Sequence, residues 1–478
     1  MNELLELEPF FWLSLICGLI GILYGWHLRR TGIGFPVMIA CVTILVWYHG
    51  DVLYNGYSDS YRTVFQEHTL TNAWIQVSIF FVSFLFLVTY THRIGNGQYF
   101  SNSSSAAYRL ATDHRMLDSV QEPLSNAWTF ISVTWLWIKS IGLWRLDFDF
   151  LGYFFPYIAG YRLAPWFRGR LGGGYDSLIT IVSYLDFFCL GAIGVVAALS
   201  YSAKIRAMAV LFIFLSWPEI LFDRTRNLMI AVVLPGLIAF AFVRLHGRIL
   251  LQVATLVLCF LGFDFWFRFV MSNRNTGSIS DAFVSGKLSS NDSRHHGLNM
   301  FEELCWINML TESGEYRPNF GMRYFAEMVN PIPRVLWKDK PMIGIDWAVA
   351  RGQGGNTADD SGVHATISTG LIGQGSVNFG LWFGPIASAF LLSIWCTILA
   401  RFDLTAQKPG RMLMYAVGSV LTFNMGRDIS LLILYPVGFA YILFSLQRPR
   451  MLGGLQSPNA IGVAQLKQTR SAIKVKTS

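Results

Sequence analysis

The sequence predicts an all-α polytopic membrane protein with about 11 transmembrane helices (range 10–12). Three observations support this fold class. Hydrophobic residues make up 53% of the 478-residue chain and charged residues only 14%, whereas soluble domains are roughly 25% charged. Several apolar runs reach the roughly 20 residues that cross a bilayer as a helix. Aromatic residues make up 15% of the chain, and a soluble protein of this size could not bury so much apolar surface.

The length criterion places the spans in order along the chain. They are residues 10–28, 32–49, 72–91, 128–145, 178–200, 207–222, 227–243, 249–271, 379–400, 411–424 and 429–446. The segment 149–161 is apolar and aromatic but too short to span. We interpret it as an interfacial helix, and the alternative is a twelfth, distorted span.

These spans divide the chain into four parts. Residues 1–271 carry the first eight spans, and residues 272–378 form a large, partly helical extracytoplasmic loop. Residues 379–446 carry the last three spans. Residues 447–478 form a basic tail that we expect to be cytoplasmic and disordered.

Lysine and arginine residues fall in alternate loops. One set of loops holds Arg29 and Arg30, residues 204–206, residues 244–248 and the basic tail. The positive-inside bias places this set in the cytoplasm. The other set begins with the acidic N-terminus and ends with the long loop, so we expect the N-terminus outside and the C-terminus inside. The net charge of +8 therefore reflects topology and does not indicate nucleic-acid binding.

The sequence predicts neither a metal site nor a cofactor. Of the six cysteines, all but Cys305 lie in apolar runs, and none has the paired spacing of a disulfide framework or a zinc site. His295 and His296 lack a third ligand at helical spacing. The glycine-rich segment 351–356 lacks the strand, helix and lysine of a nucleotide-binding loop.

The long loop has the pattern of a folded element, because its acidic and basic residues nearly balance. Apolar residues recur at helical spacing over 299–312, and a second helix is predicted over 319–329. Pro331 and Pro333 end that second helix, since proline lacks the backbone donor and restricts the residue before it.

Several arginines oppose the positive-inside bias. Arg224 and Arg226 lie in one predicted outer turn, and Arg427 lies in another. Arginine binds phosphate with two parallel hydrogen bonds, so these residues are candidates for a pyrophosphate clamp. The alternative is local pairing with Asp223 and Asp428, or contact with lipid headgroups.

Two further residues of the loop have the chemistry of a site. His364 precedes the return to the membrane, and a histidine there can act as a general base near neutral pH; the alternative is an ordinary loop histidine. Trp337 can anchor the loop at the interface or stack on a sugar.

Two segments resemble motifs of bacterial O-antigen polymerases, the membrane proteins that polymerise lipid-linked oligosaccharide repeat units. Residues 331–341, PIPRVLWKDKP, resemble the proline–arginine, tryptophan and lysine–proline signature of that family. Residues 369–380, TGLIGQGSVNFG, resemble its motif before the next span. One departure is Gln374, where the family pattern has glutamate. The resemblance covers mainly residues 220–440.

The resemblance implies a GT-C-like, metal-independent glycosyltransferase in the bacterial cytoplasmic (inner) membrane. Its substrates would be undecaprenyl-pyrophosphate-linked oligosaccharides, and a polysaccharide chain-length regulator is the implied partner besides the bilayer. For this reaction, Arg224, Arg226, Arg334 and Arg427 would form the pyrophosphate clamp, assisted by Lys338 and Lys340. His364 and Glu315 are the two candidate bases. Trp337 would form part of the platform that binds the acceptor.

Two alternative functions share many of these features. An O-antigen ligase would use the same loop and clamp with a different acceptor. A lipid-linked glycan flippase or transporter would place charges along a path through the bilayer, whereas here the charges are concentrated in the loop.

Overall fold

The computed structural model describes most of the chain and is helical throughout the part that it describes. The described residues are 8–55, 61–95, 117–118, 121–154, 176–222, 226–272, 299–352, 367–403, 409–429, 438 and 441. They all belong to one unit, residues 1–441, and residues 442–478 form a second unit outside them. Within the described ranges every regular element is a helix, which confirms the all-α class.

Four helices are long and apolar enough to cross a membrane. They are Pro9–His27, Gly34–Leu53, Glu67–Thr91 and Phe383–Phe402. The second span joins α3 (Gly34–Ile44) to the π-helical turn η1 (Leu45–His49) and α4 (Gly50–Asn55). These helices pack together, and many of their large apolar side chains remain exposed, as expected for a surface that faces lipid. The chain is therefore a membrane-embedded protein.

Further helices lie at the other predicted spans as far as 411–424. They are α9 (Gln121–Arg145), α11 (Asp176–Leu199), α12 (Ala203–Phe222), α13 (Arg226–Ala239) with η2 (Phe240–Arg244), α14 (Ile249–Ser272) and α21 (Pro409–Met425). The apolar helical runs 184–199, 232–244, 249–263 and 413–425 are shorter than a full span. The span predicted at 429–446 lies outside the described residues apart from isolated positions.

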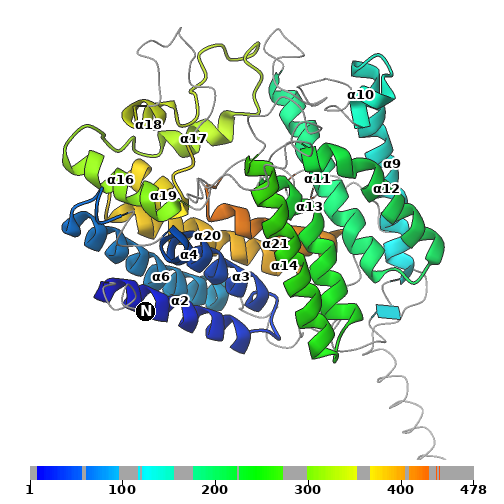
Figure 1. The fold of residues 1–478 in the computed structure, drawn as a ribbon, viewed down its shortest axis with the longest axis horizontal. Helices are drawn as coiled ribbons and strands as arrows, with labels where there is room; N and C mark the ends of the chain where they lie inside the picture. The colour runs from blue at the N-terminus through cyan, green and yellow to red at the C-terminus, as the bar shows by residue number, and fades with distance from the viewer. Residues whose placement is uncertain are drawn as a thin grey trace, which may run out of the picture. The chain divides into compact units, whose positions relative to one another are not determined.

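The helix α21 lies between two groups of helices. It contacts α3 and α20 (Phe383–Asp403) on one side and α11 and α13 on the other. Figure 1 shows α21 between these groups. α21 therefore packs against both groups.

A buried ion pair joins α9 to α11. The ammonium of Lys139 lies 2.7 Å from a carboxylate oxygen of Asp186, and both side chains are at most 4% exposed. The Lys139 ammonium also lies 5.7 Å from the ring centre of Trp135 and 5.6 Å from that of Tyr153. Tyr153 belongs to α10 (Phe150–Phe154), a short helix within the segment predicted to be interfacial, so this contact joins α10 to α9. The rest of that segment lies outside the described residues.

The long loop contains α16 (Met300–Glu312), α17 (Met322–Val329), α18 (Ile345–Ala350) and α19 (Leu371–Phe379). The first two confirm the helices predicted from periodicity and from the prolines. Ile307, Leu310, Tyr316, Trp347 and Val377 form a small core between these elements. Figure 1 shows α16 to α19 gathered beside α6 (Glu67–Gly95) and α20.

The loop is fixed to the membrane helices at α16. The rings of Trp74 and Phe301 stack with centroids 4.0 Å apart. The amides of Gln76 and Asn308 exchange hydrogen bonds of 2.6 and 3.3 Å. The carboxylate of Asp51 accepts a 2.9 Å hydrogen bond from the backbone N–H of Phe301 in the first turn of α16. A carboxylate is favourable at this end of a helix, because the first N–H groups lack helical partners.

Candidate functional site

The motif of residues 331–341 follows α17 and is stabilised largely through the backbone. The guanidinium of Arg334 donates a 2.9 Å hydrogen bond to the carbonyl of Lys338. The ammonium of Lys340 donates to the carbonyls of Asn330 and Ile332, at 2.6 and 2.7 Å. Lys340 is buried, whereas Lys338 is exposed. Lys340 thus satisfies carbonyl groups that the end of a helix leaves open.

The other predicted site residues are not gathered around this motif. Glu315 is exposed after α16, and Trp337 packs its ring edge against Phe325 with centroids 6.2 Å apart. Arg226 is the first residue of α13, and its side chain lies outside the described part of the structure. Arg224 and His364 lie outside the described residues altogether.

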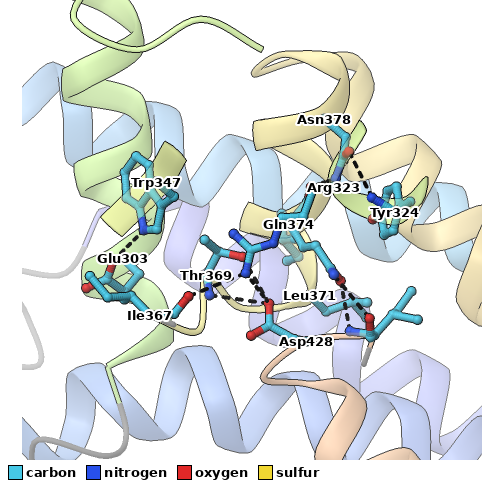
Figure 2. A network of polar contacts seen from close by, with 12 residues as sticks. Glu303, Arg323, Tyr324, Trp347, Ile367, Thr369, Leu371, Gln374, Asn378 and Asp428 are labelled. Carbon is cyan, nitrogen blue, oxygen red and sulfur yellow. Dashed lines mark hydrogen bonds and ion pairs between the residues drawn. The ribbon is translucent and has the colours of Figure 1, made fainter. Parts of the chain in front are cut away.

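A buried charged centre lies where three distant segments meet. Arg323 comes from α17, Thr369 from the segment before α19, and Asp428 from the turn after α21. The guanidinium Nη2 of Arg323 lies 3.6 Å from Oδ1 of Asp428. That oxygen also accepts hydrogen bonds from the hydroxyl and the backbone N–H of Thr369, at 3.0 and 3.3 Å. Figure 2 shows the Asp428 carboxylate facing Thr369 and Arg323.

Arg323 is incompletely paired. Its side chain is 2% exposed, and its Nη2 also donates a 3.4 Å hydrogen bond to the carbonyl of Ile367. Its Nε and Nη1 find no hydrogen-bond partner in the part of the chain that the structure describes. Leaving N–H groups of a buried cation unsatisfied is costly. The arrangement therefore leaves donors that an anion could use.

The charged centre reaches the surface at the turn after α21. The Asp428 side chain is 14% exposed, and the neighbouring Arg427 is half-buried. Burial raises the pKa of the Asp428 carboxyl above its ordinary value, although Arg323 and Arg427 counteract part of this increase. A carboxylate that holds a proton more readily than usual, beside two guanidinium groups, is a candidate proton acceptor.

Gln374 fixes the turn that carries Asp428. Its amide nitrogen donates to the carbonyl of Ile429 at 3.1 Å, and its amide oxygen accepts from the Ile429 N–H at 2.8 Å. A glutamate could accept the second hydrogen bond, but as a carboxylate it could not donate the first. Glutamine at position 374, where the resembled motif has glutamate, therefore stabilises the turn that carries Asp428.

The first turn of α19, which directly follows Thr369 and Gly370, is held from two further directions. The Leu371 N–H donates to the carbonyl of Gly426 at 3.0 Å, and the Ile372 N–H donates to the Tyr48 hydroxyl at 2.9 Å. The hydrogen bond to Tyr48 comes from η1, inside the second long membrane helix. The position of Thr369 is therefore fixed by both α21 and η1.

A second buried charge network joins α16 and α18. Glu303 of α16 accepts a hydrogen bond from the Arg351 Nη2 at 3.0 Å and from the Trp347 indole at 3.3 Å. The guanidinium of Arg351 also lies over the Trp306 ring, 4.2 Å from its centre. Burial raises the pKa of the Glu303 carboxyl, and the hydrogen bond from Arg351 counteracts this effect. These contacts fix α18 on α16 and stabilise the loop.

The sequence alone does not identify Arg323, Thr369 or Asp428 as site residues. Arg323 was only one of many arginines in the loop, and Asp428 was only a possible partner for Arg427. One signal was present: Arg323 shares a helix face with Ala326 and Glu327, opposite the apolar residues of α17. Such an arginine points away from the apolar face and toward whatever the polar face contacts.

Comparison of the chain with known protein families, curated proteins and solved structures finds no match. Within the described ranges, no group of three histidine, cysteine or acidic side chains is placed to hold a metal ion. The fold and the site thus define a membrane-embedded helical protein. In it, α17 of the long loop and the turn after α21 form a buried arginine–aspartate centre beside the membrane helices.

Proposed function

We propose that the protein is a membrane glycosyltransferase that polymerises undecaprenyl-pyrophosphate-linked oligosaccharide repeat units. The reaction would take place on the outer face of the bacterial cytoplasmic membrane. The observation that carries the proposal is the buried guanidinium of Arg323, which lies beside the Asp428 carboxylate and whose Nε and Nη1 have no hydrogen-bond partner among the described residues. The resemblance at residues 331–341 and 369–380 supplies the substrate class.

The chemistry of the substrates suits this centre. The leaving group is a lipid pyrophosphate, which gains negative charge as its bond to the sugar breaks. Guanidinium groups already in place stabilise that charge without reorganisation. Arg323 and Arg427 would therefore act as the clamp, together with the predicted Arg226 and Arg334.

Asp428 is the acceptor of the proton in this proposal. The hydroxyl oxygen of the incoming repeat unit bonds to the anomeric carbon of the growing chain. The bond between that carbon and the pyrophosphate oxygen breaks, and its electron pair leaves with the lipid pyrophosphate. The hydroxyl proton passes to Asp428. Of the bases predicted from sequence, Glu315 is exposed and His364 lies outside the described residues.

Replacement of Arg323 tests the proposal. For Arg323→Ala we expect the rate of polymer formation to fall by about 10²–10³-fold, the usual effect of removing one preorganised donor to a developing oxyanion. Arg323→Lys keeps the charge without the planar fork and should retain more activity. Arg317→Ala, at an exposed arginine of the same loop, serves as the matched control. Rates are measured in vitro with lipid-linked repeat units and equal amounts of folded protein. Normal polymerisation by Arg323→Ala would contradict the assignment.

Deletion of the gene separates this function from its alternatives. Loss of the glycan ladder, with single repeat units on the final acceptor, supports a polymerase. Polymer that stays on its lipid carrier would indicate a ligase. Repeat units trapped on the cytoplasmic side would indicate a flippase.

A further inference from the structure

Helix α17 has an unusual polarity for a helix of a loop. Its inward residues include Arg323 and Glu327, which are buried together with Ala326. Its outward residues are apolar: Met322 is 52% exposed, Phe325 45% and Met328 72%. A loop helix surrounded by water would turn its apolar stripe inward. The polarity of α17 is therefore suited to apolar surroundings on its outer side.

The apolar face extends on both sides of the helix. Phe320, which precedes it, is 87% exposed and has a positive φ of 50°. That conformation is uncommon for a bulky residue and strains the backbone there. Leu336, in the turn after the helix, is 77% exposed. Soluble monomers seldom expose so many neighbouring large apolar residues.

This face adjoins a helix that is long and apolar enough to span the membrane. The Tyr324 ring of α17 stacks on Phe379, with centroids 6.1 Å apart, and Phe379 ends α19. The chain then enters α20, where Phe383 is 73% exposed, Ile386 41% and Phe390 46%. Their spacing forms one stripe along α20, and such a stripe on a span faces lipid. Figure 1 shows α17 next to α19.

We propose that the outward face of α17, formed by Met322, Phe325 and Met328, inserts into the acyl region of the bilayer leaflet in which α20 begins. The partner is the phospholipid hydrocarbon itself. Amphipathic helices in the membrane plane bury their apolar side about 5–10 Å below the headgroups. The inward side of α17 would then keep Arg323 at the depth of the headgroup phosphates. This placement is independent of the proposed enzymatic activity.

Photo-crosslinking to lipid tests the placement. The full chain is reconstituted in phospholipid nanodiscs whose acyl chains carry an alkyne tag, with p-benzoylphenylalanine at one position at a time. The test position is Met328. Phe390 on α20 is the positive control, and the exposed Ser313 at the end of α16 is the negative control. We expect lipid adduct at Met328 comparable to that at Phe390 and at least about fivefold above that at Ser313.

Three results would overturn the proposal. The first is adduct at Met328 as low as at Ser313 while Phe390 labels fully. The second is a protein–protein adduct of twice the chain mass, which would assign the face to a second copy. The third is lipid labelling that needs added lipid-linked oligosaccharide, which would assign it to the substrate's lipid. Met322 reports on the same face should the Met328 variant fail to fold.

Discussion

At the scale of single residues, the decisive contacts join positions that are distant in the sequence. Arg323 and Asp428 come from different segments, and neither segment has a pattern that predicts their meeting. Motif resemblance led to residues 331–341, which follow α17, and to residues 369–380, which include Thr369 of this centre. It could not show that Lys340 bonds the backbone or that Gln374 bonds Ile429. Such pairings depend on tertiary packing, which a single sequence does not reveal.

A pH profile tests the role of Asp428. A base must be ionised to accept a proton, so activity should fall as the pH falls through the pKa of Asp428. Burial raises that pKa, and the acidic limb should therefore lie above the ordinary value for aspartate of about 3.9. Arg427→Gln removes a charge that lowers the pKa, so it should move the limb to higher pH. An unchanged profile in Arg427→Gln would contradict this role.

Gln374→Glu introduces the glutamate of the motif that residues 369–380 resemble, and it should destabilise this protein. The Ile429 carbonyl would lose its donor, and a buried unsatisfied group costs about 1–3 kcal/mol. Thermal unfolding in detergent measures the loss. Asp339→Asn is the matched control, because it makes the opposite carboxylate–amide exchange at an exposed position. Equal midpoints for Gln374→Glu and the original protein would argue against the proposed role of the amide.

At the scale of elements, helical periodicity and proline placement predicted α16 and α17 well. They did not predict α19, because residues 371 to 378 are buried on every side and show no amphipathic pattern. From the sequence alone, this segment is predicted only as part of a loop that leads into the next span. Gly375 of α19 and Gly384 of α20 allow the two helices to lie against each other.

The contact of α19 with α20 depends on two glycines. A Cβ at Gly375 would lie 2.1 Å from the carbonyl oxygen of Gly384, which is a backbone atom that cannot turn aside. We expect Gly375→Ala to lower both the amount of folded protein and its unfolding temperature. Gly262→Ala in α14 is the control, since a Cβ there meets nothing within 4 Å. It should be neutral or stabilising by up to about 1 kcal/mol. Equal losses in the two variants would contradict the close packing.

At the scale of the whole molecule, composition predicts the all-α membrane class. The structure has helices at the predicted spans as far as α21. Hydropathy suffices for this because a bilayer demands long apolar helices. It does not reveal which helices contact each other. The pair of Lys139 and Asp186 shows this limit, because each residue alone is a single charge in an apolar run.

Removing one member of that pair should destabilise the molecule more than removing both. Lys139→Met leaves Asp186 buried without its cation, at a cost of about 3–5 kcal/mol. Lys139→Met combined with Asp186→Leu removes both charges and should recover most of the loss. The yield and thermal stability of the single and double variants are measured in detergent. A double variant as unstable as the single one would refute the coupling.

The same pair has a consequence for how the chain enters the membrane. Lys139 and Asp186 are 47 residues apart, so at about 5–20 residues per second the lysine emerges roughly 2–9 s before its partner. A lone lysine in a membrane helix costs about 2.5–3.5 kcal/mol at the helix centre. We expect nascent chains halted before Asp186 to keep α9 crosslinked to the translocation channel and longer chains to release it. Partition of α9 into lipid would then wait for the synthesis of α11, and the two helices would leave the channel as a pair.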